Sequence, residues 1–207
     1  MRKSVDSLMK LISAFACLLA LGGTCAAVGQ TSGTCAAPMT IPFQPSMRLA
    51  IDAKPAEVDV TGTDEPGIRI RCTLDDESRA AEVKIRFERT GDTGKLAIHG
   101  GPHNNVHIQI EVPWHTDLKL RIPAGEVRID KVKGDKLIDA GAGEIVISGF
   151  EPQQYRYVHA WVNIGDVNAP VYNADKGGFF RSLERTNADG LYQLEAHVIT
   201  GSIQLQR

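Results

Sequence analysis

A short glycine-led motif recurs along the chain and constrains the fold more than any other feature. A small residue is followed by an acidic or hydroxyl residue, and then by aliphatic residues at alternate positions. The copies are AEVDV (56–60), GEVRI (125–129), GEIVI (143–147), GDVNA (165–169) and GSIQL (201–205). From Gly125 onward, consecutive copies start 18, 22 and 36 residues apart. Self-similarity near 20 residues is typical of a solenoid, in which one coil stacks on the next.

The motif predicts an all-β fold built as a β-solenoid. Successive side chains of a strand point to opposite faces, so Val127 and Ile129 should share the interior with Ile145 and Ile147 of the next coil. A corner between coils favours glycine, which tolerates positive φ and close backbone approach. This role is expected for the repeat glycines Gly125, Gly143, Gly165 and Gly201.

Two further expectations follow from the spacing. Stacked coils predict parallel pairing between 126–130 and 144–148, whereas the alternative fold, a two-layer β-sandwich, predicts hairpin-connected antiparallel strands. The 36-residue interval is twice 18, so a degenerate coil is expected between 166 and 200.

The segment between the first two copies is expected to be an antiparallel insertion. TGDT is a hairpin turn signal between strands at 81–89 and 94–100, and further strands are expected at 104–113 and 117–123. One face should be wet, since it carries Lys84, Arg86 and Glu88.

Residues 177–198 break the simple pattern. Phe179, Phe180 and Leu183 are expected to plug the open end of the stack, because an exposed terminal coil is an aggregation-prone edge. The alternative is an aromatic patch that binds a ligand.

The N-terminal end predicts export. A basic start is followed by an apolar run at 11–21 and small residues, which is the layout of a signal peptide over 1–27. A retained anchor and a lipoprotein acylated at Cys25 are the alternatives. Residues 28–46 are expected to be a flexible lead-in and 47–207 a single domain, located in the periplasm, outside the cell or at a membrane.

Cys35 and Cys72 are the cysteines left after such a cleavage. An even number in an exported chain favours a disulfide, which would tie the lead-in to the first repeat. Two unpaired thiols are the alternative.

Residues 47–207 resemble the bacterial putative adhesin family, whose members are related to auto-transporter adhesin head domains. The resemblance lies in the sequence Ile110, Glu111, Val112, Pro113, in the repeated coils that follow, and in a final TGSI (200–203). It implies a right-handed β-solenoid without established catalytic residues. The irregular 166–200 region departs from the simplest members.

Two groups of residues are candidate metal ligands. His99, His103 and His107 fall within nine residues, but a structural zinc site needs about four ligands, and exposed histidines are the favoured interpretation. Glu126, Glu144 and Asp166 share one coil position and could form a carboxylate row that binds Ca²⁺. Relief of their repulsion by solvent and nearby basic residues is favoured, so neither metal nor cofactor is expected.

The larger aromatic residues leave two interpretations open. Trp114, Trp161, Tyr155, Tyr157 and Tyr172 could form an exposed row that binds glycans, although core packing is commoner for such groups. A shared exposed face for Trp114, Trp161 and Tyr157 would favour the glycan interpretation.

No catalytic or nucleotide-binding motif appears, and a net charge of −2 gives no field that would attract nucleic acid. The expected function is therefore that of an exported, non-enzymatic structural or interaction module of the cell envelope, with an envelope protein or polymer as partner. The alternatives are a glycan-binding module and a small β-helix enzyme acting on polysaccharide.

Overall fold

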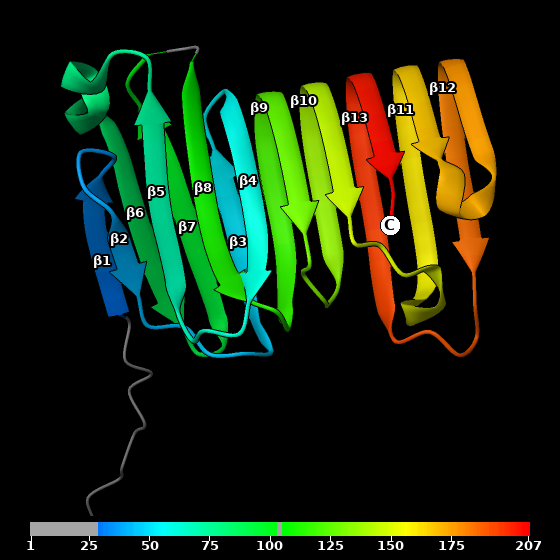
Figure 1. The fold of residues 1–207 in the computed structure, drawn as a ribbon, viewed down its shortest axis with the longest axis horizontal. Helices are drawn as coiled ribbons and strands as arrows, with labels where there is room; N and C mark the ends of the chain where they lie inside the picture. Colours follow the sequence, from blue (N-terminus) through cyan, green and yellow to red (C-terminus); the bar gives the residue numbers. More distant parts are fainter. Residues whose placement is uncertain (1–28, 103–104) are drawn as a thin grey trace, which may run out of the picture.

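The computed structural model describes residues 29–102 and 105–207, so the expected signal peptide lies outside the described residues. Thirteen strands of the described chain form one mixed sheet (Figure 1). They are β1 (Gly29–Thr34), β2 (Met39–Ile41), β3 (Met47–Ala53), β4 (Ala56–Thr63), β5 (Ile68–Leu74), β6 (Val83–Thr90), β7 (Thr93–Gly100), β8 (Val106–Pro113), β9 (Thr116–Asp130), β10 (Lys136–Ser148), β11 (Tyr155–Ala169), β12 (Ala174–Thr186) and β13 (Tyr192–Leu205). Short 3₁₀ helices are η1 (Glu77–Glu82), η2 (Pro152–Gln154) and η3 (Pro170–Tyr172).

Strands β9 and β10 pair in parallel with an 18-residue offset, as the repeat spacing predicts. Gly125 lies opposite Gly143, and Val127 lies opposite Ile145. Both aliphatic side chains are fully buried, at 0% exposure. The predicted parallel pairing of 126–130 with 144–148 is therefore confirmed, and the two copies share one dry interior.

The repeat glycines form a row in which one backbone packs directly on the next. Gly143 has a φ of +124°, and a Cβ added to it would lie 1.8 Å from the carbonyl oxygen of Gly125. A Cβ on Gly201 would lie 1.7 Å from the carbonyl oxygen of Gly143. Only a residue without a side chain fits this stacking, which explains why the motif begins with glycine.

The order of the stack differs from the order of the sequence. Strand β13 pairs in parallel with both β10 and β11, so Gly201 lies between Gly143 and Gly165. The prediction that each copy stacks on the one before it is wrong at this point. Figure 1 shows the red strand β13 inserted between β10 and β11.

The interval 166–200 holds no degenerate coil. It contains η3 and β12, and β12 runs antiparallel to β11. Because β12 reverses the chain direction, the next strand can return parallel to β11 and fill the place beside β10. A reversal within the interval therefore replaces the expected extra coil.

The sheet divides into two branches at β9. The first half of β9 pairs with β3, and its second half pairs with β4. One branch continues through β3, β7, β6 and β1, and the other through β4, β8, β5 and β2. Buried residues of both branches belong to one hydrophobic cluster, so the core lies between them.

The insertion is only partly antiparallel. The predicted hairpin is present, since β6 and β7 pair antiparallel, and Lys84 and Arg86 are exposed on its wet face while Glu88 is half-buried. However, β7 pairs in parallel with β3, and β8 pairs in parallel with β4. These strands thus extend the stacked arrangement toward the N-terminal end.

Part of the expected flexible lead-in is ordered as strand. Strand β1 pairs with β6, and β2 pairs with β5. Ile41 and Phe43 are buried in the core. Both short strands therefore cover the N-terminal end of the stack.

The prediction that Phe179, Phe180 and Leu183 plug the other end of the stack is wrong for the two phenylalanines. Leu183 is buried, but Phe179 is 68% exposed and Phe180 is 81% exposed. Phe179 lies opposite Ile164, which is exposed as well, so this ring is on the outer side of β12.

Long cations occupy the core side of the terminal strand instead. Lys176, Arg181 and Arg185 lie opposite the buried Val167, Val162 and Val158 of β11, and cross-strand partners share a face. The Lys176 ammonium donates to the carbonyl of Ser182 (2.8 Å), and Arg181 Nε donates to that of Gly177 (2.8 Å). Alkyl stems and inward charges therefore cover the end of the core.

Candidate functional site

Aromatic and histidine rings gather on the outer face of β11 and β13. In β11, Val158, Ala160 and Val162 are buried, and the alternate residues Tyr157, His159 and Trp161 therefore face outward. The register places His197 of β13 beside Trp161. We call these four residues, Tyr157, His159, Trp161 and His197, the ring strip.

The rings of the strip stack on one another. The ring centroids of His159 and Trp161 are 4.4 Å apart with an interplanar angle of 20°, and those of Trp161 and His197 are 4.8 Å apart at 15°. Tyr157 lies 6.2 Å from His159 in a tilted arrangement. Each ring is half-buried, so the strip is both fixed by its neighbours and open to solvent.

Polar contacts hold the edge of His197. Its Nδ1 lies 3.1 Å from a carboxylate oxygen of Asp139, and its Nε2 lies 3.3 Å from the amide oxygen of Asn163. Asp139 also faces Arg121, at 3.6 Å. These three residues come from β9, β10 and β11, and their positions depend on the parallel register of β9, β10, β13 and β11.

One hollow adjoins the strip, and a second lies further along the same outer face. The first has a volume of about 200 Å³ and is lined by Trp161, His197, Leu137, Asp139, Lys119 and Arg121 among others. The second, of about 380 Å³, lies over β3 and β7 and shares Lys119 and Arg121 with the first. The exposed Leu137 adds an apolar surface next to the rings.

The predicted carboxylate row is present only in part. Glu126 lies beside Glu144, and Glu57 lies on the other side of Glu126. Asp166 does not follow Glu144, because Ser202 of β13 comes between them. Ser202 Oγ donates to Glu144 (2.9 Å), so the inserted strand replaces a repulsive neighbour with a hydrogen-bond donor.

Arginine relieves the remaining repulsion in this row. Arg128 contacts Glu57, and its guanidinium lies 2.6 Å from Glu126. Burial raises the pKa of the Glu126 carboxyl, and Glu144 and Glu57 add to this, whereas Arg128 opposes it. The contacts in the structure thus agree with the interpretation in which a nearby basic residue relieves the repulsion between these carboxylates.

Of the three histidines considered as metal ligands, the two within the described residues are not brought together. His103 lies outside the described residues. His99 is on β7 and His107 on β8, which belong to different branches of the sheet. His107 instead lies close to Asp59, with 2.7 Å between its Nε2 and a carboxylate oxygen.

Glu57, Asp59 and His107 form the group of the described chain best placed to hold a metal ion. Their ligand atoms lie within 4.8 Å of one another. Sequence reasoning missed this group because it joins residues about 50 positions apart. The Arg128 guanidinium already lies against Glu57 and 3.9 Å from Asp59, so a protein cation occupies the space between these carboxylates.

The aromatic residues whose shared exposed face would favour glycan binding are divided between two places. Trp161 and Tyr157 share the outer face of β11, but Trp114 is 40% exposed in the connection between β8 and β9, away from the strip. Tyr155 is buried and stacks on Phe150, with ring centroids 4.5 Å apart. The two histidines of the strip were not considered as partners of these rings, although His159 shares the period-2 face of Trp161.

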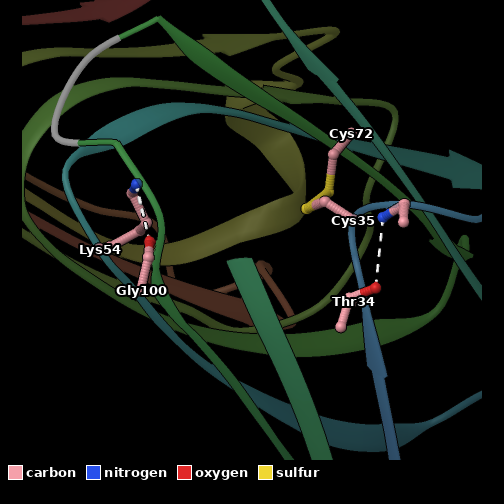
Figure 2. Close-up of a disulfide and its surroundings, with 6 residues drawn as sticks. Thr34, Cys35, Lys54, Cys72 and Gly100 are labelled. Carbon is pink, nitrogen blue, oxygen red and sulfur yellow. Dashed lines mark hydrogen bonds between the residues drawn. A yellow bond between two sulfur atoms is a disulfide. The ribbon is translucent and has the colours of Figure 1, made fainter. Parts of the chain in front are cut away.

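Cys35 and Cys72 are joined in a disulfide, with 5.3 Å between their Cα atoms. Figure 2 shows the bond between the chain after β1 and strand β5. In the same view, the Lys54 ammonium donates to the carbonyl of Gly100 (3.0 Å). The disulfide ties the ordered part of the lead-in to the second branch of the sheet.

Comparison with solved structures shows a similarity that is limited to the fold. The crystal structure of a putative cell adhesion protein from Clostridium sporogenes ATCC 15579 aligns with a TM-score of 0.55 and 12% sequence identity. The alignment covers 86% of this chain and 99% of that chain. No family model and no curated protein sequence matches the chain. The resemblance to the adhesin family therefore stays an expectation.

Among the residues that the structure describes, no helix combines the length and the apolar character that crossing a membrane requires.

Proposed function

We propose that this chain is an exported, non-enzymatic interaction module of the bacterial cell envelope, and that the outer face carrying the ring strip is its binding surface. The observation that carries the proposal is the ring strip itself, which two strands distant in sequence build on one face. Half-buried aromatic groups held rigid by their neighbours are the kind of residue that dominates binding surfaces.

The proposal includes a finer description of the fold. The parallel rows of β9, β10, β13 and β11 act as coils of a short right-handed β-solenoid, and β12 closes its last coil. The fold similarity to a putative cell adhesion protein supports the proposed interaction role. A rigid stack suits a binding role, since its face needs no ordering when a partner arrives.

A non-enzymatic role is supported by the way in which charged groups are used. Three acidic residues, Glu57, Glu126 and Asp59, lie around the guanidinium of Arg128, with Asp59 the furthest at 3.9 Å. Carboxylates engaged in this way are poorly suited to act as a free acid and base pair. Incubation of the protein with polysaccharides should release no new reducing ends, and their appearance would establish the alternative, a polysaccharide-active enzyme.

Affinity capture from envelope extract tests the binding surface. The wild-type protein and a Trp114→Ala variant should retain the same envelope component, because Trp114 lies away from the strip. A Trp161→Ala/His197→Ala variant should lose it. Equal retention by all three proteins, or retention by none, would contradict the proposed surface.

A further inference from the structure

One row of residues connects the two hollows with the ring strip. Register places Lys95, Ala50, Lys119, Leu137, Glu195 and His159 side by side across six strands. Neighbouring strands are about 4.8 Å apart, so the row extends over about 24 Å. This length suits a ligand that lies across the strands as a chain better than a small molecule held in one pocket.

The volumes of the two hollows also favour a ligand that lies across the strands as a chain. Their volumes of about 200 and 380 Å³ fall below or near the lower end of the range of about 300–1,000 Å³ for drug-sized ligands. A third hollow, of about 660 Å³, shares Arg121 with both and Asp139 with the first. Because the first two share Lys119 and Arg121, successive units of one chain could occupy both. The surface is therefore built as adjoining shallow subsites.

The lining of the first hollow is partly apolar and partly charged. The parts of the stacked Trp161 and His197 rings that stay open to solvent, together with the side chain of Leu137, offer an apolar surface. Lys119, Arg121 and Asp139 offer hydrogen-bond donors and acceptors beside it. A sugar ring has a matching pair of surfaces, since its C–H groups form an apolar face and its hydroxyl groups lie around the edge.

Charge selects the class of polymer. Four Lys and Arg residues and three Asp and Glu residues line the two hollows: Arg86, Lys95, Lys119 and Arg121, against Asp52, Glu88 and Asp139. Arg86 pairs with Glu88 at 2.6 Å, and Arg121 faces Asp139 at 3.6 Å. Such a balanced surface favours neither a polyanion nor a polycation, whereas hydroxyl groups can donate to its acids and accept from its bases.

We infer that the outer face binds a neutral polysaccharide chain, which lies across β7, β3, β9, β10, β13 and β11 and packs sugar rings against Trp161, His197 and Leu137. This inference rests on the proposed function and names the chemical class of the ligand. The polymer bridges the two hollows over Lys119 and Arg121.

Affinity electrophoresis tests the inference directly. The purified protein is run in native gels that contain dextran, mannan or mixed-linkage β-glucan as neutral polymers, or alginate or polygalacturonate as polyanions. At least one neutral polymer should retard the wild-type protein and the Trp114→Ala control equally. Trp161→Ala should weaken the retardation by about tenfold or more in apparent Kd, as expected for loss of a central aromatic contact, and Trp161→Phe should restore part of it. High salt should leave the retardation unchanged, since no net charge is matched.

The contrary results are distinct. If only the polyanions retard the protein, or if high salt abolishes the retardation, the ligand is acidic and the inference is overturned. The inference is also overturned if none of the five polymers retards the protein, or if Trp114→Ala and Trp161→Ala reduce the retardation equally. Circular dichroism and thermal melting establish that each variant is folded before its mobility is compared.

A parallel capture experiment separates this failure from failure of the proposed function. Envelope extract is treated either with periodate, which cleaves vicinal diols of sugars, or with protease. Capture through the strip means capture that the Trp161→Ala/His197→Ala variant loses. If such capture persists after periodate treatment of the extract but is lost after protease treatment, the interaction function stands and the polysaccharide ligand is wrong. If nothing is captured through the strip from untreated extract, the proposed function itself fails.

Discussion

Lys136 carries its ammonium group into the core at the start of β10. The residue is only 3% exposed, and its Nζ donates to the hydroxyl of Tyr155 (2.6 Å) and to the carbonyl of Gly134 (3.1 Å). Burial lowers the pKa of Lys136 to about 7, although Asp117 and Asp135 oppose the shift. At neutral pH, the folded protein thus holds this proton much less firmly than the unfolded chain does.

This environment predicts a pH dependence of stability. Between pH 7 and the usual lysine pKa of about 10.4, the unfolded chain binds more protons than the folded protein, so the free energy of unfolding should rise with pH. From pH 7 to 9 the rise should be on the order of 2 kcal/mol. Urea denaturation at both pH values measures it. Lys136→Met should flatten the rise, and Lys95→Met, at an exposed position, should retain it. An equal slope in both variants would contradict the assignment.

At the scale of single elements, the glycine row and the disulfide fix how strands meet. Gly143 is held at positive φ with its backbone against Gly125, and Cys35 joins the N-terminal strands to β5. Each feature acts on the packing of one element on the next, so its removal should be visible in stability before any effect on binding.

Gly143→Ala should destabilise the protein by roughly 3 kcal/mol or more, because alanine is strained at this φ and its Cβ would overlap the carbonyl oxygen of Gly125. Gly29→Ala is the matched control, since nothing lies within 4 Å of a Cβ at that position. Chemical denaturation of both variants provides the comparison. A cost below about 1 kcal/mol for Gly143→Ala would show that the strands can separate there without penalty.

Removal of the disulfide should cost about 3–4 kcal/mol in the chain-entropy model, because it closes a loop between residues 37 positions apart. The midpoint of urea unfolding should fall on reduction of the wild-type protein. A Cys35→Ala/Cys72→Ala variant should already have the lower midpoint and should not respond to reductant. A wild-type midpoint that reductant does not change would argue against the bond.

The repeats made part of this architecture predictable from sequence. Alternation along each copy identified the buried faces, including Val127 and Ile145, because strand geometry leaves few alternatives. The insertion of β13 could not be foreseen. The copies at 143, 165 and 201 carry similar residues at most positions, so the residues do not distinguish their pairing partners, and the antiparallel β12 decides which two become neighbours. The ring strip could not be predicted for the same reason, since His197 lies beside Trp161 only when β13 pairs with β11.

At the scale of the whole molecule, the two ends of the stack are protected by different means. Short strands and a disulfide cover the N-terminal end, and inward cations of β12 cover the other. Inward-pointing charges are a known way to prevent edge-to-edge pairing of sheets. The outer faces between these ends remain available for binding.

Loss of the inward cations should promote self-association. Lys176→Val/Arg181→Val places two β-formers on the core side of the terminal strand and leaves an apolar edge. Sedimentation velocity should show dimers or larger species that the wild-type protein does not form. Ser182→Val, on the outer side of the same strand opposite Trp161, should remain like the wild type. A monomeric double variant would mean that these cations do not guard the edge.

The insertion of β13 between β10 and β11 joins the fold to the proposed function, because it brings His197 to Trp161. Paired cysteine substitutions test it, since a disulfide requires Cα atoms no more than about 7 Å apart. Glu144 and Ser202 are cross-strand neighbours, whereas Glu144 and Asp166 are two strands, or about 9.6 Å, apart. Mild oxidation should link Glu144→Cys/Ser202→Cys and leave Glu144→Cys/Asp166→Cys unlinked, as peptide mapping by mass spectrometry would show. A link in the second pair but not in the first would place β11 beside β10 and contradict the account.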